Sequence, residues 1–430
     1  MRSREGQSLR VAVLARSVYP LHRYGGLERH VYDLVRCLLA RDLRITLVTP
    51  PLARNRPQDA RADAVFGHPN LTMHFVPYTT FPFANRRGTT IVDRSTAYPL
   101  FGMRAGRLAA RLATAGDLDI VHGLGASALG YALTEFEPGK RAPFVVNPQG
   151  LEEFGATDPS RAALKLAGYW PLRTAVRRTA KVANCVIATD RSLVSPVVSH
   201  LRISRDVVRV IPNAIELADC DGPGAAERAV GLRARVGLQP DDLLLVSVGR
   251  LEANKGFNVL IRALAILMQR GALPQRWRWV LAGDGPMRHE LQSHVVSAGL
   301  GEHALLRGRV ATDELHGWYE AATLFVHPTL YEGSSLVTLE AMAHRRAVVA
   351  THAGGLPDKV IPGGNGWLVT PGNAEALANA VLDASSSDRR RLSVMGAAGR
   401  ALVEREFSWD VVTDRLLAVY RELLTPPGSL

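Results

Sequence analysis

Short runs of apolar, β-branched residues alternate with longer amphipathic segments along almost the whole chain. In residues 28–40, for example, Val31, Leu34, Val35, Leu38 and Leu39 share one helical face. Strands that are apolar throughout and separated by helices indicate a parallel sheet covered on both faces. In the first half the pattern predicts strands at residues 10–15, 45–49, 72–76, 120–122, 144–146, 185–189 and 207–211.

The same alternation restarts in the second half. It predicts strands at residues 243–248, 279–282, 305–307, 324–327 and 347–350, and helices at 259–269, 287–298 and 334–344. Residues 218–231, which include Gly222, Pro223 and Gly224, are the candidate interdomain linker. We therefore expect an α/β protein of two Rossmann-like, doubly wound domains, residues 1–215 and 216–408. A last helix, 409–424, is expected to pack back on the first domain.

Composition fits this organisation. The 430 residues, 47% of them hydrophobic, are enough for two or three domains with their own cores. No apolar stretch approaches the ~20 residues that span a bilayer, and no signal-peptide pattern follows the N-terminus, so we expect a cytoplasmic protein. Cys37, Cys185 and Cys220 form no CxxC pair, and the sequence therefore carries no disulfide framework and no zinc or redox signature.

The charge is unevenly distributed. Residues 1–215 hold 30 Lys and Arg against 16 Asp and Glu, a net +14, whereas residues 216–430 hold 22 against 24, a net −2. The basic half suggests an anionic partner, either a phosphorylated acceptor or the inner face of a membrane, unless the charges are merely solvated. Nucleic acid is disfavoured, because no RNP, zinc-finger or basic-helix pattern accompanies the charge. Two clusters are candidate membrane contacts. One is Arg86 and Arg87, which follow Phe81 and Phe83; the other lies in a helical stretch with Trp170 and consists of Arg161, Lys165, Arg173, Arg177, Arg178 and Lys181.

Four loops that follow predicted strands and precede helices contain residues suited to ligand binding. Gly25 and Gly26 allow a backbone to approach a phosphate or sugar closely at a helix start. Arg250 and Lys255, five residues apart in the second such loop, can converge on a diphosphate. The third loop has Gly283 in a Gly-Asp-Gly-Pro turn. A turn or surface charges would explain each of these features singly.

The fourth loop runs into a helix with an E-x7-E spacing. Glu332 lies just before the helix start, Gly333, Ser334 and Ser335 form its entry, and Glu340 lies about two turns inside. Free amides at such a start bind phosphate, and carboxylates accept hydrogen bonds from sugar hydroxyls. Two surface glutamates are the alternative for this spacing alone.

Taken together, these segments resemble the retaining family-four glycosyltransferases (glycosyltransferase group 1), which have the GT-B fold. In that fold two Rossmann-like domains face each other across a cleft that holds a nucleotide sugar. The resemblance covers nearly the whole chain, and its most specific parts are the Arg-Leu-x3-Lys-Gly loop and the E-x7-E segment followed by Ala-Met-Ala. It also includes residues 211–216, 354–358 and 365–369.

The resemblance implies a role for each of these residues. Arg250 and Lys255 would hold the donor diphosphate, Glu332 would bind hydroxyls of the transferred sugar, and Glu340 would bind the ribose. Further donor contacts are implied for Gly25, Gly26, Gly249, Gly283, Val310, Gly333, Ser334, Ser335 and Leu336. His122 is a further catalytic candidate that the resemblance implies, with a satisfied strand-end histidine as the alternative. Here the sequence departs from the family, because His122 keeps the first position of a His-x-His pair while Leu124 replaces the second. Gln149-Gly150 likewise stands where relatives have His-Gly, so the acceptor side is less defined.

The implied activity is transfer of a sugar from a nucleotide-diphosphate donor to an acceptor hydroxyl, with retention, for envelope or other polysaccharide or glycoconjugate synthesis. Front-face transfer is favoured over double displacement, because the one candidate nucleophile, Glu332, is expected to bind hydroxyls. The acceptor is a sugar, a lipid-linked molecule or a small molecule. No cofactor and no divalent metal are expected, because the DxD matches at 117–119 and 219–221 fall at a wrong strand end and in the linker.

Two other function classes remain open on the residues alone. A nucleotide-sugar epimerase would use the same architecture, and incubating the donor alone distinguishes it from a transferase. A non-catalytic nucleotide-sugar binding protein is disfavoured by the intact Arg250, Lys255, Glu332 and Glu340. A dehydrogenase is poorly supported, because no G-x-G-x-x-G follows the first strand.

Overall fold

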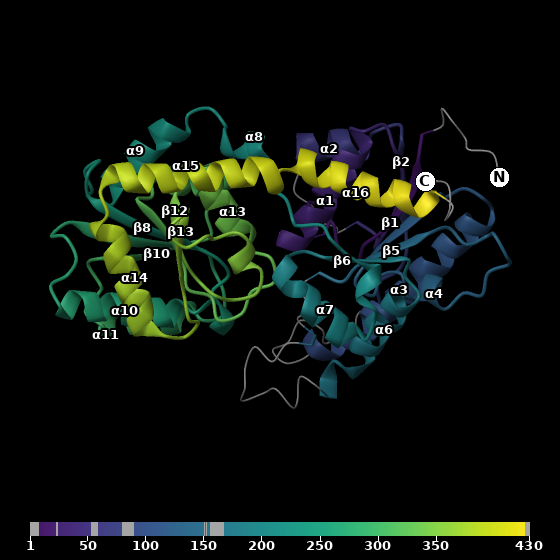
Figure 1. Cartoon of the computed structure of the whole chain (residues 1–430), viewed down its shortest axis with the longest axis horizontal. Coiled ribbons are helices and arrows are strands. Elements are labelled where there is room, and N and C mark those ends of the chain that lie inside the picture. The colour runs from purple at the N-terminus through teal and green to yellow at the C-terminus, as the bar shows by residue number, and fades with distance from the viewer. Residues whose placement is uncertain are drawn as a thin grey trace. The chain divides into compact units, whose positions relative to one another are not determined.

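The computed structural model describes residues 8–22, 25–52, 59–79, 90–149, 151, 153–154 and 167–425. The chain divides into two compact units, of which unit 1 comprises Met1–Asn213 and Val412–Leu430 and unit 2 comprises Ala214–Val411 (Figure 1). The last helix, α16 (Trp409–Leu424), therefore belongs for most of its length to the first unit. None of the helices in the described ranges is long and apolar enough to cross a bilayer.

Unit 1 is built on a parallel sheet. Its described strands lie in the order β3-β2-β1-β4-β5-β6-β7, and every neighbouring pair is parallel, which confirms the seven strands predicted from the sequence. The strands are β1 Arg10–Leu14, β2 Arg44–Thr49, β3 Leu71–Phe75, β4 Ile120–Leu124, β5 Phe144–Asn147, β6 Cys185–Ala188 and β7 Val208–Val210. Besides α16, the described residues of unit 1 form the α-helices α1 Gly26–Leu39, α2 Ala60–Phe66, α3 Thr90–Thr114, α4 Leu129–Ala132, α6 Trp170–Lys181 and α7 Val194–Leu201.

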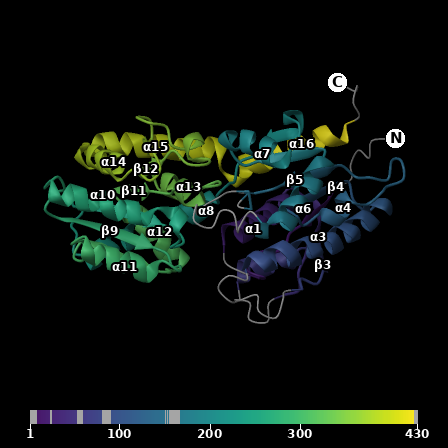
Figure 2. The same ribbon diagram turned by 90° about the horizontal axis from the view of Figure 1, so that it is seen from below.

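Helices cover both faces of this sheet (Figure 2). Val121 of β4 packs in a core that includes Phe101 and Ala105 of α3. The next residue, His122, points to the opposite face, because successive strand side chains alternate, and there it meets Tyr420 of α16. Helix α3 was not among the helices named from the sequence, and it contains Pro99.

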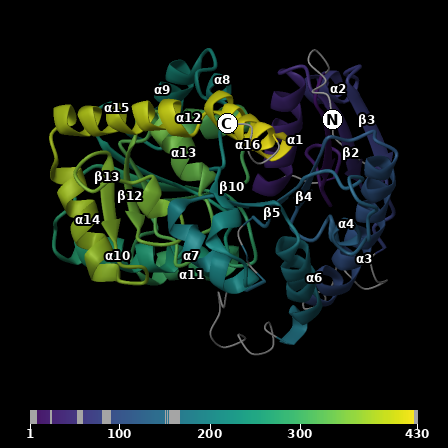
Figure 3. The ribbon, with the colours of Figure 1, turned by 45° about the vertical axis from the view of Figure 1, so that its right-hand side comes forward.

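Unit 2 has a six-stranded parallel sheet in the described residues, in the order β10-β9-β8-β11-β12-β13. Its strands are β8 Leu243–Val248, β9 Trp277–Ala282, β10 Ala304–Gly308, β11 Leu324–His327, β12 Ala347–Thr351 and β13 Gly366–Val369. The first five confirm the prediction, and β13 was not predicted as a strand. Helices α10 Phe257–Gln269, α11 Arg288–Ser297 and α14 Ala374–Ser386 cover one face; α9 Ala225–Arg235, α12 Thr312–Ala321, α13 Leu336–Ala343 and α15 Arg389–Glu406 cover the other. Figure 3 shows α13 and α15 above this sheet and α10 below it.

The predicted linker at residues 218–231 is wrong as a description of local structure. Most of it is helical, in α8 (Leu217–Cys220) and the first part of α9, and it is part of unit 2. Ala229 and Leu232 of α9 are buried in the core that includes α12. Gly222, Pro223 and Gly224 form only the turn between the two helices, because turn residues do not by themselves separate domains.

Candidate functional site

The candidate site of unit 2 lies where the strand order of its sheet reverses. From β8 the chain passes outward through β9 and β10, and then returns to place β11 on the other side of β8. In open parallel sheets, loops that diverge at such a point leave room for a ligand beyond the carboxyl ends of the strands. Here the diverging loops are residues 249–256, after β8, and residues 328–335, after β11.

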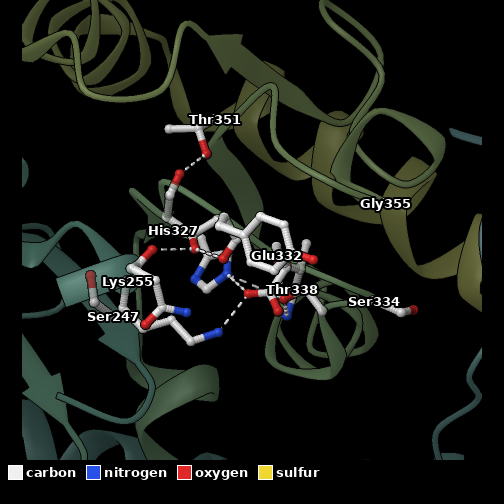
Figure 4. A network of polar contacts seen from close by, with 12 residues as sticks. Ser247, Lys255, His327, Glu332, Ser334, Thr338, Thr351 and Gly355 are labelled. Carbon is white, nitrogen blue, oxygen red and sulfur yellow. Dashed lines mark hydrogen bonds and ion pairs between the residues drawn. The ribbon is translucent and has the colours of Figure 1, made fainter. Parts of the chain in front are cut away.

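Three side chains from these two loops and from β11 form a compact cluster (Figure 4). The Lys255 Nζ donates to Glu332 Oε2 at 2.7 Å, and His327 Nε2 lies 2.9 Å from the same oxygen. The side chain of Lys255 is 19% exposed, that of Glu332 12% and that of His327 0%. The fold thus brings together two predicted site residues that are far apart in sequence, and adds His327, which the sequence analysis read only as the end of a strand.

The charge state of this cluster follows from its contacts. Burial by itself would raise the pKa of Glu332, but the hydrogen bond from His327 and the charge of Lys255 together lower it to about 2. Burial lowers the pKa of His327, against the opposing effect of Glu332. At neutral pH a carboxylate therefore accepts hydrogen bonds from an ammonium group and from a neutral imidazole.

The start of α13 adjoins the cluster. Ser335 is its N-cap, and the Ser335 Oγ accepts a hydrogen bond from the Thr338 N–H at 3.4 Å and lies 3.4 Å from His327 Nε2. The first amides of a helix have no acceptor within it and favour an anion. Further along the helix, Glu340 Oε2 accepts a hydrogen bond from the Tyr319 hydroxyl at 2.7 Å. Leu336 and Val310 are partly buried against the core on this side of the sheet.

Glycine and a buried lysine hold the entry loop of α13 in place. Gly354 has φ of +52°, and a Cβ there would overlap the carbonyl oxygen of Glu332, while the Gly355 N–H donates to the Gly333 carbonyl at 2.9 Å. The fully buried Lys359 donates from Nζ to Ser334 Oγ at 3.2 Å. Nothing in the sequence motifs pointed to Lys359.

The loop after β8 packs against the loop after β9. Gly283 has φ of +145°, and a side chain there would overlap the Gly249 carbonyl oxygen. Arg250, in contrast to Lys255, is not part of the cluster: its side chain is 72% exposed and its Nε lies 3.2 Å from Glu252 Oε1. Of the two cations predicted to hold a diphosphate, the structure therefore places one in the buried cluster and the other on the surface.

The predicted site residues of unit 1 occupy different environments. Gly25 is the N-cap of α1 and Gly26 its first residue, and both are exposed. His122 is buried inside the unit, with Nδ1 2.6 Å from the Tyr420 hydroxyl, and burial together with the neighbouring His30 lowers its pKa to about 3. His122 is thus neutral, and its ring lies between the sheet and α16. Gly150, Arg86, Arg87, Arg161 and Lys165 lie outside the described residues.

In each DxD match, an arginine engages one of the two carboxylates. Asp119 pairs with Arg10 at 2.7 Å, just before β4, and both Asp221 oxygens accept from Arg400 at 2.8 and 2.7 Å. A hollow of about 750 Å³ lies elsewhere, in unit 1, and its lining includes Arg104, Arg107 and Arg111 of α3.

Comparison with known proteins agrees with this geometry. The family model described as "Glycosyltransferase Family 4" matches residues 24–219, and the model described as "Glycosyl transferases group 1" matches residues 242–387. The alpha-maltose-1-phosphate synthase of Mycobacterium tuberculosis is 28% identical over 96% of this chain and all of its own length. The D-inositol 3-phosphate glycosyltransferase 1 of Catenulispora acidiphila is 36% identical, over 47% of this chain and 49% of that protein.

Solved structures share the fold over nearly the whole chain. Sucrose-phosphate synthase from Thermosynechococcus elongatus has a TM-score of 0.74 at 22% identity and covers 96% of this chain and 99% of its own. Anabaena HepE in complex with UDP-glucose has a TM-score of 0.67 at 20% identity, covering 96% and 100%. The two parallel sheets, the two matching family models and the similar solved structures all agree. The chain therefore belongs to the family 4, group 1 glycosyltransferases and has the GT-B fold.

Proposed function

We propose that this glycosyltransferase moves a sugar from a nucleoside-diphosphate donor to an acceptor hydroxyl with retention at the anomeric carbon. The observation that carries the proposal is the Lys255–Glu332 pair, held at the reversal point of the sheet beside the start of α13. An ammonium group binds phosphate and a carboxylate binds a sugar hydroxyl, so the two side chains together suit a phosphate that is linked to a sugar. The UDP-glucose complex of the HepE neighbour supports a nucleotide-sugar donor.

Each group has a part in donor binding. The Lys255 ammonium balances the diphosphate charge, the first amides of α13 bind the phosphate oxygens, and Glu332 accepts hydrogen bonds from the sugar. Glu340, held by Tyr319, binds the ribose diol. His327 keeps Glu332 ionised and oriented, and so acts as a positioning residue.

Transfer is proposed to occur on the front face of the sugar. The diphosphate oxygen leaves as the acceptor hydroxyl attacks from the same side, and that oxygen takes the hydroxyl proton. Glu332 is occupied by Lys255 and His327, which suits a hydrogen-bond acceptor better than a nucleophile. The main contributions to the rate are then positioning and stabilisation of the leaving diphosphate by Lys255.

The reaction is proposed to need no divalent metal, because Lys255 and the α13 amides supply positive charge where the leaving group develops negative charge. Turnover that is unchanged in excess EDTA is the expected result, and turnover abolished by EDTA and restored by Mg²⁺ or Mn²⁺ would overturn this part.

The donor is tested by thermal unfolding of the full chain with UDP-, GDP- and ADP-sugars. A donor that binds the folded site raises the melting temperature through linkage, and UDP-glucose is the first candidate. Lys255→Ala is expected to lower turnover about 10²–10³-fold, by analogy with the loss of one oxyanion donor. Arg250→Ala is the matched control, because its exposed side chain predicts a smaller loss. Near-normal turnover of Lys255→Ala would refute the assignment.

An anionic membrane surface is proposed as a partner of unit 1. On α6, Trp170 is 65% exposed, and Arg178 and Lys181 are exposed near the end of the same helix. Arg177 is less available, because its Nε donates to the His200 carbonyl at 2.7 Å. Flotation with vesicles that contain anionic lipid is the test. Equal flotation of wild type and Trp170→Ser would argue against this surface.

A further inference from the structure

Three buried side chains with metal-binding atoms meet in unit 2, outside the Lys255–Glu332–His327 cluster. Cys220 ends α8, His316 lies in α12 and His344 follows α13. The Cys220 sulfur and one ring nitrogen from each histidine all lie within 4.8 Å of one another. The three residues are 5%, 8% and 3% exposed. No other such trio of His, Cys, Asp or Glu was found in the part of the chain that the structure describes.

The hydrogen bonds around the trio orient it as a ligand set. His344 Nδ1 lies 3.1 Å from Glu320 Oε2, and a carboxylate oxygen is a hydrogen-bond acceptor. His344 Nδ1 therefore carries a hydrogen, and in the neutral ring the lone pair is on Nε2, which faces His316 Nδ1 at 2.9 Å. An imidazole that donates its far N–H to a carboxylate is typical of histidines that bind zinc.

The distances suit a tetrahedral ion of this class. Zn–S bonds of about 2.3 Å and Zn–N bonds of about 2.0–2.1 Å place neighbouring ligand atoms roughly 3.3–3.6 Å apart. The ligand atoms of the cluster fit around that range, since the two facing ring nitrogens are 2.9 Å apart and all three ligand atoms lie within 4.8 Å of one another. Small rotations of the three side chains would complete the geometry.

We propose that Cys220, His316 and His344 form a structural binding site for Zn²⁺ or a cation of similar softness, with a water molecule as fourth ligand. A thiolate with two imidazoles is a donor set that zinc prefers over magnesium or calcium. On binding, the Cys220 thiol, which donates to the Glu216 carbonyl at 3.7 Å, releases its proton to solvent. The hydrogen that His316 Nδ1 donates to His344 Nε2 is lost to solvent while His316 Nε2 takes one up, so the His316 ring stays neutral and Nδ1 is free to bind the ion.

Such an ion would join three elements that are far apart in the sequence. It would hold α8, the first helix of unit 2, to α12 and to the end of α13, the helix that carries Glu340. Its role is to stabilise this side of the unit. None of the three residues is assigned to the leaving diphosphate, so a metal here is compatible with metal-independent transfer.

The test uses the full chain without a polyhistidine tag, stripped with chelator and titrated with Co²⁺ or Zn²⁺ alone. Co²⁺ at this site is expected to give a thiolate charge-transfer band and strong d–d bands at one ion per chain, and Zn²⁺ is expected to displace it. Cys220→Ala should abolish the charge-transfer band. Cys37→Ala and Cys185→Ala are matched controls, because both remove a buried cysteine of unit 1 and should leave the band unchanged.

Glu320→Gln gives a second readout that does not remove a ligand. It should leave the stoichiometry at one ion per chain and weaken binding by about 10–100-fold, as expected when a carboxylate behind a ligating histidine is lost. Absence of stoichiometric binding in the stripped wild type would overturn the proposal. A charge-transfer band that persists in Cys220→Ala, or Glu320→Gln affinity equal to that of wild type, would do the same.

Discussion

Replacement of Lys255 by methionine is the most direct perturbation of the candidate donor site. Methionine keeps the length of the apolar stem and removes the ammonium group that lies 2.7 Å from Glu332 Oε2. Glu332 then remains a largely buried carboxylate, with His327 as its remaining partner in the cluster. The variant should therefore lose stability as well as donor binding.

The magnitude follows from the state of Glu332. Its pKa falls from 4.5 to about 2 in the folded protein, which at about 1.4 kcal/mol per unit corresponds to roughly 3 kcal/mol. Removal of one partner of a buried ion pair costs about 3–5 kcal/mol, and the retained His327 bond favours the lower end. For Lys255→Met we expect a loss of about 3 kcal/mol in the free energy of unfolding at pH 7.

The pH dependence gives this loss a signature. Because the folded pKa of Glu332 is depressed, its stabilisation is complete above the unfolded value near 4.5 and falls by about 1.4 kcal/mol per pH unit down to about 2. The difference between wild type and Lys255→Met should thus shrink by about 2 kcal/mol between pH 7 and pH 3.

Urea unfolding followed by tryptophan fluorescence measures the effect. Apart from Trp170, the tryptophans of the chain lie in unit 2, so this signal reports the unit that contains the substitution. The double variant Lys255→Met/Glu332→Gln is the control: it removes the buried charge and should recover most of the stability but not the turnover. Two results would refute the reasoning: a loss in the free energy of unfolding of Lys255→Met below about 1 kcal/mol, or a loss that is equal at pH 7 and pH 3.

Two further predictions concern backbone and packing. Gly354→Ala should lower the free energy of unfolding by about 1–3 kcal/mol more than Gly363→Ala does. Both glycines have positive φ, but only a Cβ at residue 354 would overlap the Glu332 carbonyl oxygen. Equal melting temperatures of the two variants would contradict this. Tyr420→Phe should cost about 1–3 kcal/mol by leaving His122 Nδ1 unpaired inside the unit. Calorimetry measures that loss, and a large change in donor affinity without loss of stability would instead place His122 at the ligand.

Local periodicity predicted most of the regular elements. Apolar strands such as 243–248 and 324–327 are recognisable because every residue of a buried parallel strand is in contact with protein, and both strands have the predicted bounds in the structure. The same signal failed where another rule competes with it. Helix α3, which contains Pro99, was not among the helices named from the sequence. Gly222, Pro223 and Gly224 form the turn between α8 and α9, and their residue types led to the wrong prediction of a linker.

By itself, the sequence determined the fold class and the loops that bear ligand-binding residues, because both depend on patterns within one or two elements. Which side chains meet was decided by the tertiary structure. The strand order sets β8 beside β11, and so pairs Lys255 with Glu332 and His327 while Arg250 stays exposed. Helix packing likewise gathers residues from α8, α12 and the end of α13 around one point, since distances between remote segments follow from register and packing, which no local pattern encodes.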